Sequence, residues 1–210
     1  MEVAITNTQQ GVITEAEFAK IAILTSNGRL VPTRALADDD RRDFEIHIRR
    51  HFRESLAVQL KTAKHLRLHG RSRVLQINFR VKAPLVSDEH LYYFLAHFDI
   101  KAMGYTDPVF LIPSTVFHKI ADPQRKGAFH WFVMGANMEK RTRDKWEPYR
   151  VNTLDLGKHL LKIMNDLKKH RDRNLSLAKV PAAGGVLLLR QTTQRRGRLK
   201  KAVGTHRAAA

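Results

Sequence analysis

Apolar and polar residues alternate strictly in two short segments of the first third of the chain. In DFEIHIR (43–49) and in LAVQLKT (56–62), every second residue is apolar and large. A period of two places the apolar side chains on one face of a β-strand and the polar side chains on the other. The connection between the segments is short, so we expect the two strands to pair as an antiparallel hairpin.

The segment before this hairpin has the spacing of a helix. In TEAEFAKIAILTSNG (14–28), Thr14 is a plausible N-cap and Glu17 stands three residues later, as in a capping box. Glu17, Ile21 and Leu24 follow i, i+4, i+7 spacing and share one helical face. The pair Asn27-Gly28 predicts the end of the helix. After it, RLVP leads into a polar loop.

The rest of the core reads as further strands and two helices. An amphipathic helix is predicted over 154–170, with Leu156, Leu160, Ile163 and Leu167 on one stripe. The other expected elements are a short helix over 114–121 and strands over 73–81, 90–100, 107–113 and 128–134. This order predicts an α/β (α+β) fold with a central mixed β-sheet flanked by helices. We expect one domain over residues 1–175 and a basic, flexible tail over 176–210.

Composition narrows the class of protein. The chain has 210 residues and no cysteine, which excludes disulfides, thiolate metal sites and a cysteine nucleophile. It has no long uncharged apolar stretch, and its N-terminus lacks the basic and apolar regions of a secretory signal. We therefore expect a cytoplasmic protein that does not enter a membrane.

Charge points to a polyanionic partner. The formal net charge is +18, and the residues after position 167 include 12 basic side chains and one acidic side chain. Such an excess is typical of proteins that bind nucleic acid, although a charged tail or loop can also be only solvated. A second basic cluster at 140–150 is interleaved with Trp146 and Tyr149. The predicted nucleic-acid-binding residues are Lys140, Arg141, Arg143, Lys145, Arg195, Arg196, Arg198, Lys200 and Lys201.

The predicted hairpin carries a set of polar residues that suits phosphodiester hydrolysis. Asp43 begins its first strand, and Gln59 and Lys61 share the polar face of its second strand. Glu17 on the preceding helix can approach the same patch. Carboxylate and amide oxygens are ligands for Mg²⁺, and a lysine beside the metal can orient water or stabilise phosphate charge.

These residues resemble the core of the PD-(D/E)xK, or restriction-endonuclease-like, nuclease superfamily, over roughly residues 12–167. That core has an acid on a helix, an Asp on a strand and [E/Q]xK on the next strand, matched here by Glu17, Asp43, Gln59 and Lys61. The resemblance implies a restriction-endonuclease-like fold and an endonuclease that uses Mg²⁺ (or Mn²⁺). It also implies metal ligation by Asp43, Glu17 and Gln59, DNA rather than RNA as substrate, and a possible homodimer.

The residues leave other readings open. Gln59 stands where Glu is more usual, which suits a nucleic-acid-binding accessory protein with reduced cleavage on the same scaffold. An RNA- or ribosome-associated protein of unrelated fold is a third hypothesis. Glu17 can also be only the capping partner of Thr14, and Glu45 or Asp40 can replace a predicted ligand.

Overall fold

The computed structural model describes residues 5–34, 42–51, 54–121, 123–139 and 143–174, with side chains as far as Lys169. The described residues as far as Lys168 form one compact unit. The predicted tail, 176–210, lies outside the described residues. The helices of the described part are α1 (Asn7–Thr25), α2 (Ser114–Ile120) and α3 (Leu156–Asn174), with 3₁₀ turns η1 (Glu147–Tyr149) and η2 (Thr153–Asp155).

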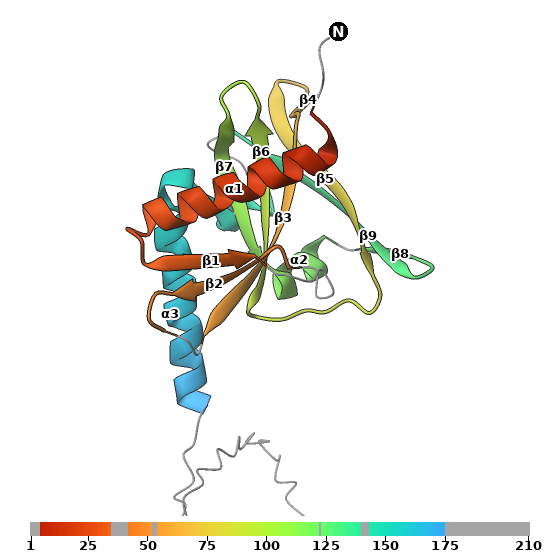
Figure 1. Ribbon diagram of the computed structural model, residues 1–210. Helices are drawn as coiled ribbons and strands as arrows, with labels where there is room; N and C mark the ends of the chain where they lie inside the picture. Colours follow the sequence, from red (N-terminus) through yellow and green to blue (C-terminus); the bar gives the residue numbers. More distant parts are fainter. Residues whose placement is uncertain (1–4, 35–41, 52–53, 122, 140–142, 175–210) are drawn as a thin grey trace, which may run out of the picture. The chain divides into compact units, whose positions relative to one another are not determined.

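A six-stranded mixed sheet forms the first layer of strands (Figure 1). Its strands, in spatial order, are β1 (Leu30–Arg34), β2 (Phe44–Ile48), β3 (Ser55–Ala63), β6 (Leu91–Asp99), β7 (Gly104–Pro113) and β10 (Arg150–Val151). The neighbours β3 and β6 run parallel, and the other neighbouring pairs run antiparallel. The predicted α+β fold with a mixed central sheet is therefore confirmed.

A second sheet of four antiparallel strands was not predicted. Its strands, in spatial order, are β4 (Arg67–His69), β5 (Ser72–Lys82), β9 (Phe129–Asn137) and β8 (Gln124–Lys126). The sequence pattern predicted β5 and β9, but β4 and β8 are three residues long and wholly exposed, so they carry no apolar pattern. They were found only through their pairing with the longer strands.

Two apolar cores lie on the two faces of the mixed sheet. On one face, Val58 and Leu60 of β3 are buried in the same cluster as Phe18 of α1 and Leu160 of α3. On the other face, Tyr93 of β6 shares a cluster with residues of β5, β9 and α2. Since β3 alternates, Gln59 and Lys61 point toward the second sheet, away from the helical layer.

The start of α1 differs from its prediction. The helix begins seven residues before Thr14, and its N-cap is Thr6, which forms a capping box with Gln9. Thr14 lies within the helix, where its hydroxyl donates to the carbonyl of Gly11. The helical spacing of the sequence is compatible with a helix capped at Thr14 or at Thr6. The helix is capped at Thr6 because the capping box there satisfies backbone amides of the first turn. The predicted end was correct, because Asn27 and Gly28 have positive φ angles of 54° and 69°.

The buried stripe of α1 also differs from the predicted Glu17, Ile21 and Leu24 face. Leu24 is 65% exposed. The residues of α1 that are buried are Gln10, Thr14, Phe18 and Ala22. Two of these are polar, so an apolar pattern could not reveal the stripe. In α3 the predicted stripe was largely right, because Leu156 and Leu160 are buried, with Ile163 and Leu167 packed against the same core.

The residues after α1 form a strand, where the sequence analysis assigned no element to RLVP (29–32) and expected a polar loop from Thr33. β1 pairs antiparallel with β2, from Leu30 opposite Ile48 to Arg34 opposite Phe44. Only Leu30 of this edge strand is buried. An edge strand needs little apolar sequence because backbone hydrogen bonds to one neighbour hold it, which explains why the pattern missed it.

Candidate functional site

Asp43 is fixed against the middle of β3. The predicted hairpin forms, with Phe44 opposite Val58. The backbone amide of Asp43 donates to the carbonyl of Val58 at 3.0 Å, and the amide of Leu60 donates to Asp43 Oδ2 at 2.5 Å. These two bonds flank Gln59 on either side. The carboxylate of Asp43 is thus held beside Gln59 by the strand backbone, as the sequence predicted from their places on one hairpin.

Gln59 is buried, with 8% of its surface exposed. It lies on β3 between Val58 and Leu60, and pairs in register with Tyr93 of β6. Within the described part of the chain, no hydrogen bond to the Gln59 side-chain amide is found. The amide atoms are not among the buried polar atoms that lack a partner, so the end of this side chain reaches solvent and is available to water, an ion or a ligand.

Lys61 follows on the same face of β3 and is half-buried. Its ammonium lies 5.9 Å from the centre of the Phe79 ring on β5. Among the described residues, no carboxylate forms an ion pair with it. A partly desolvated ammonium without a counter-ion attracts anions such as phosphate.

Glu15 of α1 interacts electrostatically with Asp43 and Lys61. The sequence analysis did not single out this residue. Burial raises the pKa of the Glu15 carboxyl above its ordinary value of 4.5, Arg34 lowers it, Asp43 raises it and Lys61 lowers it. Glu15 also forms an ion pair with Arg34 at 2.9 Å. Burial is the largest cause of this raised pKa, and the smaller contribution of Asp43 places the two carboxylates within electrostatic reach of each other.

Glu17, the acid predicted for this role, lies beside the start of β7. Its carboxylate forms an ion pair with Lys20 at 2.5 Å and lies next to Gly104. Together with burial, its charge raises the pKa of Tyr105, whose hydroxyl donates to the carbonyl of Thr14. The helix therefore offers two acids, and spacing on a helix could not tell which one turns toward Asp43.

Glu45, the alternative ligand, has partners of its own. Its carboxylate forms an ion pair with Arg42 and lies 3.7 Å from Nε2 of His47. Asp40, the other alternative, lies outside the described residues.

The raised pKa of Glu15 predicts a pH effect on stability. A carboxyl whose pKa is raised on folding contributes stability below its ordinary pKa and loses that contribution as pH rises through the folded value. We expect Glu15→Gln to lose less stability than the wild type between about pH 4 and about pH 7. Denaturant unfolding across this pH range measures the difference.

The matched control for this prediction is Glu89→Gln, which removes an exposed carboxyl in the segment before β6. It should follow the wild-type pH profile. Loss of the Arg34 ion pair shifts the stability of the Glu15→Gln variant at all of these pH values, so only the slope with pH is diagnostic. A Glu15→Gln slope equal to that of the wild type would contradict the assigned coupling.

Part of the predicted nucleic-acid surface is described. Arg143 and Lys145 have exposed side chains, and Lys145 Nζ donates to the carbonyl of Ile120 at 3.2 Å. The remaining predicted contacts lie outside the described residues: Lys140, Arg141, Arg195, Arg196, Arg198, Lys200 and Lys201.

The aromatic residues within the basic cluster at 140–150 belong to the core. Trp146 is fully buried, and its ring lies 5.5 Å from that of Phe117 in the second core. Tyr149 packs against the same core. Aromatic residues that stand among basic residues can anchor a charged segment to the core. Only their burial in the structure distinguishes this role from that of a surface on which bases stack.

A second polar cluster joins α2 to β6. Nδ1 of His118 is 2.6 Å from the Ser87 hydroxyl and Nε2 is 2.9 Å from the Tyr93 hydroxyl. Burial, and to a lesser extent the nearby His130, lower the pKa of His118 to about 4. A neutral histidine whose two ring nitrogens are both hydrogen-bonded holds these elements together. We therefore interpret this cluster as structural.

The donor set at Asp43 suits a hard cation bound with its substrate. Among the described residues, no group of three or more His, Asp or Glu side chains is arranged to hold a metal ion. Mg²⁺, however, is often bound by one or two carboxylates together with substrate phosphates. The carboxylate of Asp43 and the accessible amide of Gln59 beside it fit that mode of binding.

Comparison with known proteins gives little beyond the fold. No protein-family model matches the chain, and no curated protein matches it in sequence. Among solved structures, the chain is similar to a bacterial homing endonuclease, I-Ssp6803I, with a TM-score of 0.47 and 15% sequence identity. The match covers 80% of this chain and 99% of that chain. At this level no function follows from the likeness. In the described part of this chain, none of the helices is long and apolar enough to cross a membrane.

Proposed function

We propose that the protein is a metal-dependent endonuclease that hydrolyses phosphodiester bonds in DNA. The observation that carries the proposal is the Gln59 amide. Gln59 is largely buried, but its amide end has no hydrogen-bond partner among the described residues and stays accessible, and Asp43 is tied to the strand on both sides of it. An amide oxygen without a protein partner is free to accept from water or to bind a cation.

Asp43 and Gln59, which lie side by side on the hairpin, would hold Mg²⁺ (or Mn²⁺) together with the substrate phosphate. Glu15 of α1, instead of the expected Glu17, would add negative charge near Asp43. The bond from the Leu60 amide fixes the rotamer of Asp43. Burial is the main cause of the raised pKa of Glu15 and the charge of Asp43 is a smaller one, so a cation held by Asp43 would reduce the part that Asp43 contributes. A bound divalent cation supplies polarisation of the phosphate and a lower pKa for water.

Lys61 would act on the phosphate or on the attacking water. Its ammonium lies on the same face of β3 as Gln59, without an ion pair among the described residues, and it is coupled to Glu15. A fixed positive charge stabilises the negative charge that develops on the phosphate during hydrolysis. The exposed Arg143 and Lys145 would contact the backbone of the same nucleic acid, and the predicted basic tail would add to that attraction.

A DNA-binding accessory protein with little or no cleavage is the second candidate. The neutral amide of Gln59 favours it, since an amide brings an oxygen but no charge to the metal. The two candidates share a binding surface and differ in whether the metal is held tightly enough for chemistry.

Nicking of supercoiled plasmid by the full chain in Mg²⁺ or Mn²⁺ tests the proposal. We expect metal-dependent nicking by the wild type and loss of nicking in Gln59→Ala. Gln59→Glu should reach half-maximal nicking at about a tenfold lower Mg²⁺ concentration, because a third carboxylate strengthens the site.

Asn165→Ala, an exposed amide on α3, is the matched control and should nick like the wild type. Binding of the plasmid without nicking in either metal would reject the endonuclease and support the accessory protein. Nicking that persists in chelator, or that Gln59→Ala leaves unchanged, would reject the assigned site.

A further inference from the structure

The outer face of the second sheet carries long polar side chains in a regular row. On β5, Leu75, Ile77 and Val81 are buried in the second core. Strand alternation therefore directs the even-numbered residues to the opposite, outer face, where Asn78 and Arg80 are exposed and Gln76 is half-buried. The row Gln76, Asn78 and Arg80 repeats every second residue along one strand.

The neighbouring strands continue this face. On β9, Trp131 is opposite Arg80, Val133 is opposite Asn78 and Gly135 is opposite Gln76. Trp131 and Val133 are 41% and 61% exposed. On β4, Arg67 is opposite Val74, next to Gln76 along the same face. We call the residues Arg67, Gln76, Asn78, Arg80, Trp131, Val133 and Gly135 the outer row.

Contacts within the outer row hold its side chains in place. Gln76 Nε2 donates to Asn78 Oδ1 at 3.4 Å, and the guanidinium of Arg80 lies 4.9 Å from the centre of the Phe129 ring. Side chains held in this way lose less entropy on binding than free ones.

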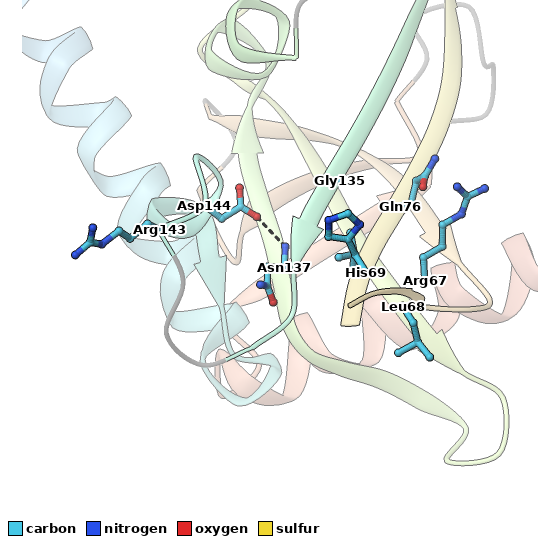
Figure 2. Close-up of a pocket in the computed structure, with 9 residues that line it drawn as sticks. Arg67, Leu68, His69, Gln76, Gly135, Asn137, Arg143 and Asp144 are labelled. Atoms are coloured by element: carbon cyan, nitrogen blue, oxygen red, sulfur yellow. Dashed lines mark hydrogen bonds between the residues drawn. The ribbon is translucent and has the colours of Figure 1, made fainter. Parts of the chain in front are cut away.

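The end of the outer row opens into a groove of about 710 Å³, shown in Figure 2. Its lining includes Arg67, Gln76 and Gly135 of the outer row, together with Arg143 and Asp144. Asp144 is occupied within the protein, because its carboxylate accepts from the backbone amides of Asn137 and Trp146. The groove is therefore lined by two arginines and by one carboxylate whose oxygens are bonded to backbone amides.

Gly135 keeps the floor of this groove open without being required by the fold. A Cβ added there would meet only Val74 Cγ1, at an ordinary contact distance of 3.8 Å. The backbone does not have a positive φ at this position. A glycine at this position therefore leaves space above the sheet and keeps the backbone of β9 accessible.

We propose that the outer row binds in the major groove of duplex DNA and reads base edges. Amide side chains such as Gln76 and Asn78 can form paired hydrogen bonds with adenine, and Arg67 or Arg80 with guanine. Val133 offers an apolar contact of the kind made with the thymine methyl group. The inference rests on the proposed function for its substrate, and adds the surface by which that substrate is recognised.

Duplex DNA fits this surface better than RNA or another protein does. The major groove of B-DNA, about 12 Å wide, admits a β-ribbon, whereas the deep, narrow major groove of RNA helices does not. The row holds two amides and two arginines beside the adjacent Trp131 and Val133, and is therefore more polar than the centre of a stable protein interface.

The experiment measures the binding of the full chain to 30-base-pair duplexes with a randomised centre, in chelator so that cleavage does not interfere. Selection should yield a preferred sequence from the wild type. Gln76→Ala with Asn78→Ala should weaken binding to that sequence about tenfold or more and leave binding to random duplex within about twofold. Arg80→Ala should weaken preference for one base pair.

Matched variants separate recognition from loss of folding. Gly135→Ala and Gly135→Glu place the same Cβ in the groove, but only the second adds a carboxylate. We expect at least about tenfold weaker binding in the second and a smaller loss in the first, because only the second places negative charge beside the DNA. Asn165→Ala on α3 and Arg49→Ala on the β2–β3 turn remove exposed side chains elsewhere and should bind like the wild type.

The outcomes distinguish this inference from the proposed function. Equal sequence preference and affinity in all outer-row variants, beside nicking that depends on Gln59, would overturn the inference and leave the nuclease. Loss of preference in the outer-row variants, without nicking by the wild type, would support the inference on an accessory protein. If the wild type forms dimers, and the outer-row variants abolish them while DNA binding stays unchanged, the inference is also overturned.

Discussion

Lys61→Ala is expected to reduce metal-dependent nicking by at least about 100-fold, the usual effect of removing one proton-transfer or charge-stabilising group. DNA affinity in chelator should change by less than about threefold, since one lysine is a small part of a surface with many cations. Quantified nicking of supercoiled plasmid and a mobility-shift titration measure the two effects. We expect this large loss of nicking because Lys61 lies on the same face of β3 as Gln59 and interacts electrostatically with Glu15.

Lys101→Ala is the control for this variant. Lys101 is an exposed lysine in the β6–β7 turn, and its removal changes the net charge by the same amount. It should nick like the wild type. If the two lysine variants lose activity equally, Lys61 contributes only to general attraction of DNA. Retained nicking in Lys61→Ala would remove it from the site.

Gly157→Ala is expected to lower the free energy of unfolding by about 2–3 kcal/mol, the range for overfilling a packed contact. A Cβ on Gly157 would lie 2.4 Å from the backbone nitrogen of Ser26 and 2.6 Å from Thr25 Oγ1. The Gly157 amide donates to that same Oγ1 at 2.8 Å. The start of α3 therefore packs directly on the end of α1, and a methyl group would force them apart. Denaturant unfolding measures the loss.

Gly11→Ala adds the same methyl group to a helix where nothing lies within 4 Å of the new Cβ. It should stabilise the protein by about 0.5–1 kcal/mol, because alanine favours a helix over glycine. The opposite signs of the two glycine variants would show that the contact between the helices matters, and not helix propensity. Equal stability of Gly157→Ala and the wild type would reject the close contact.

The second helix acid shows where prediction at the site reached its limit. The hairpin that joins Asp43 to Gln59 and Lys61 follows from alternation and a short connection, both of which are local. Glu15 and Glu17 are two residues apart on α1 and therefore point in different directions, so the choice depends on how the helix is rotated over the sheet. That rotation is set by the burial of Gln10, Thr14, Phe18 and Ala22, half of them polar.

The sequence by itself determined the long strands, the end of α1, the amphipathic α3 and the pairing of Asp43 with the QxK strand. These features depend on periodicity and on neighbours within one hairpin. Only the tertiary structure decided that Trp146 is core, that Glu15 is coupled to Asp43, and that β4 and β8 complete a second sheet. Each of these depends on contacts between segments far apart in the chain, whose energies no local pattern of residues records.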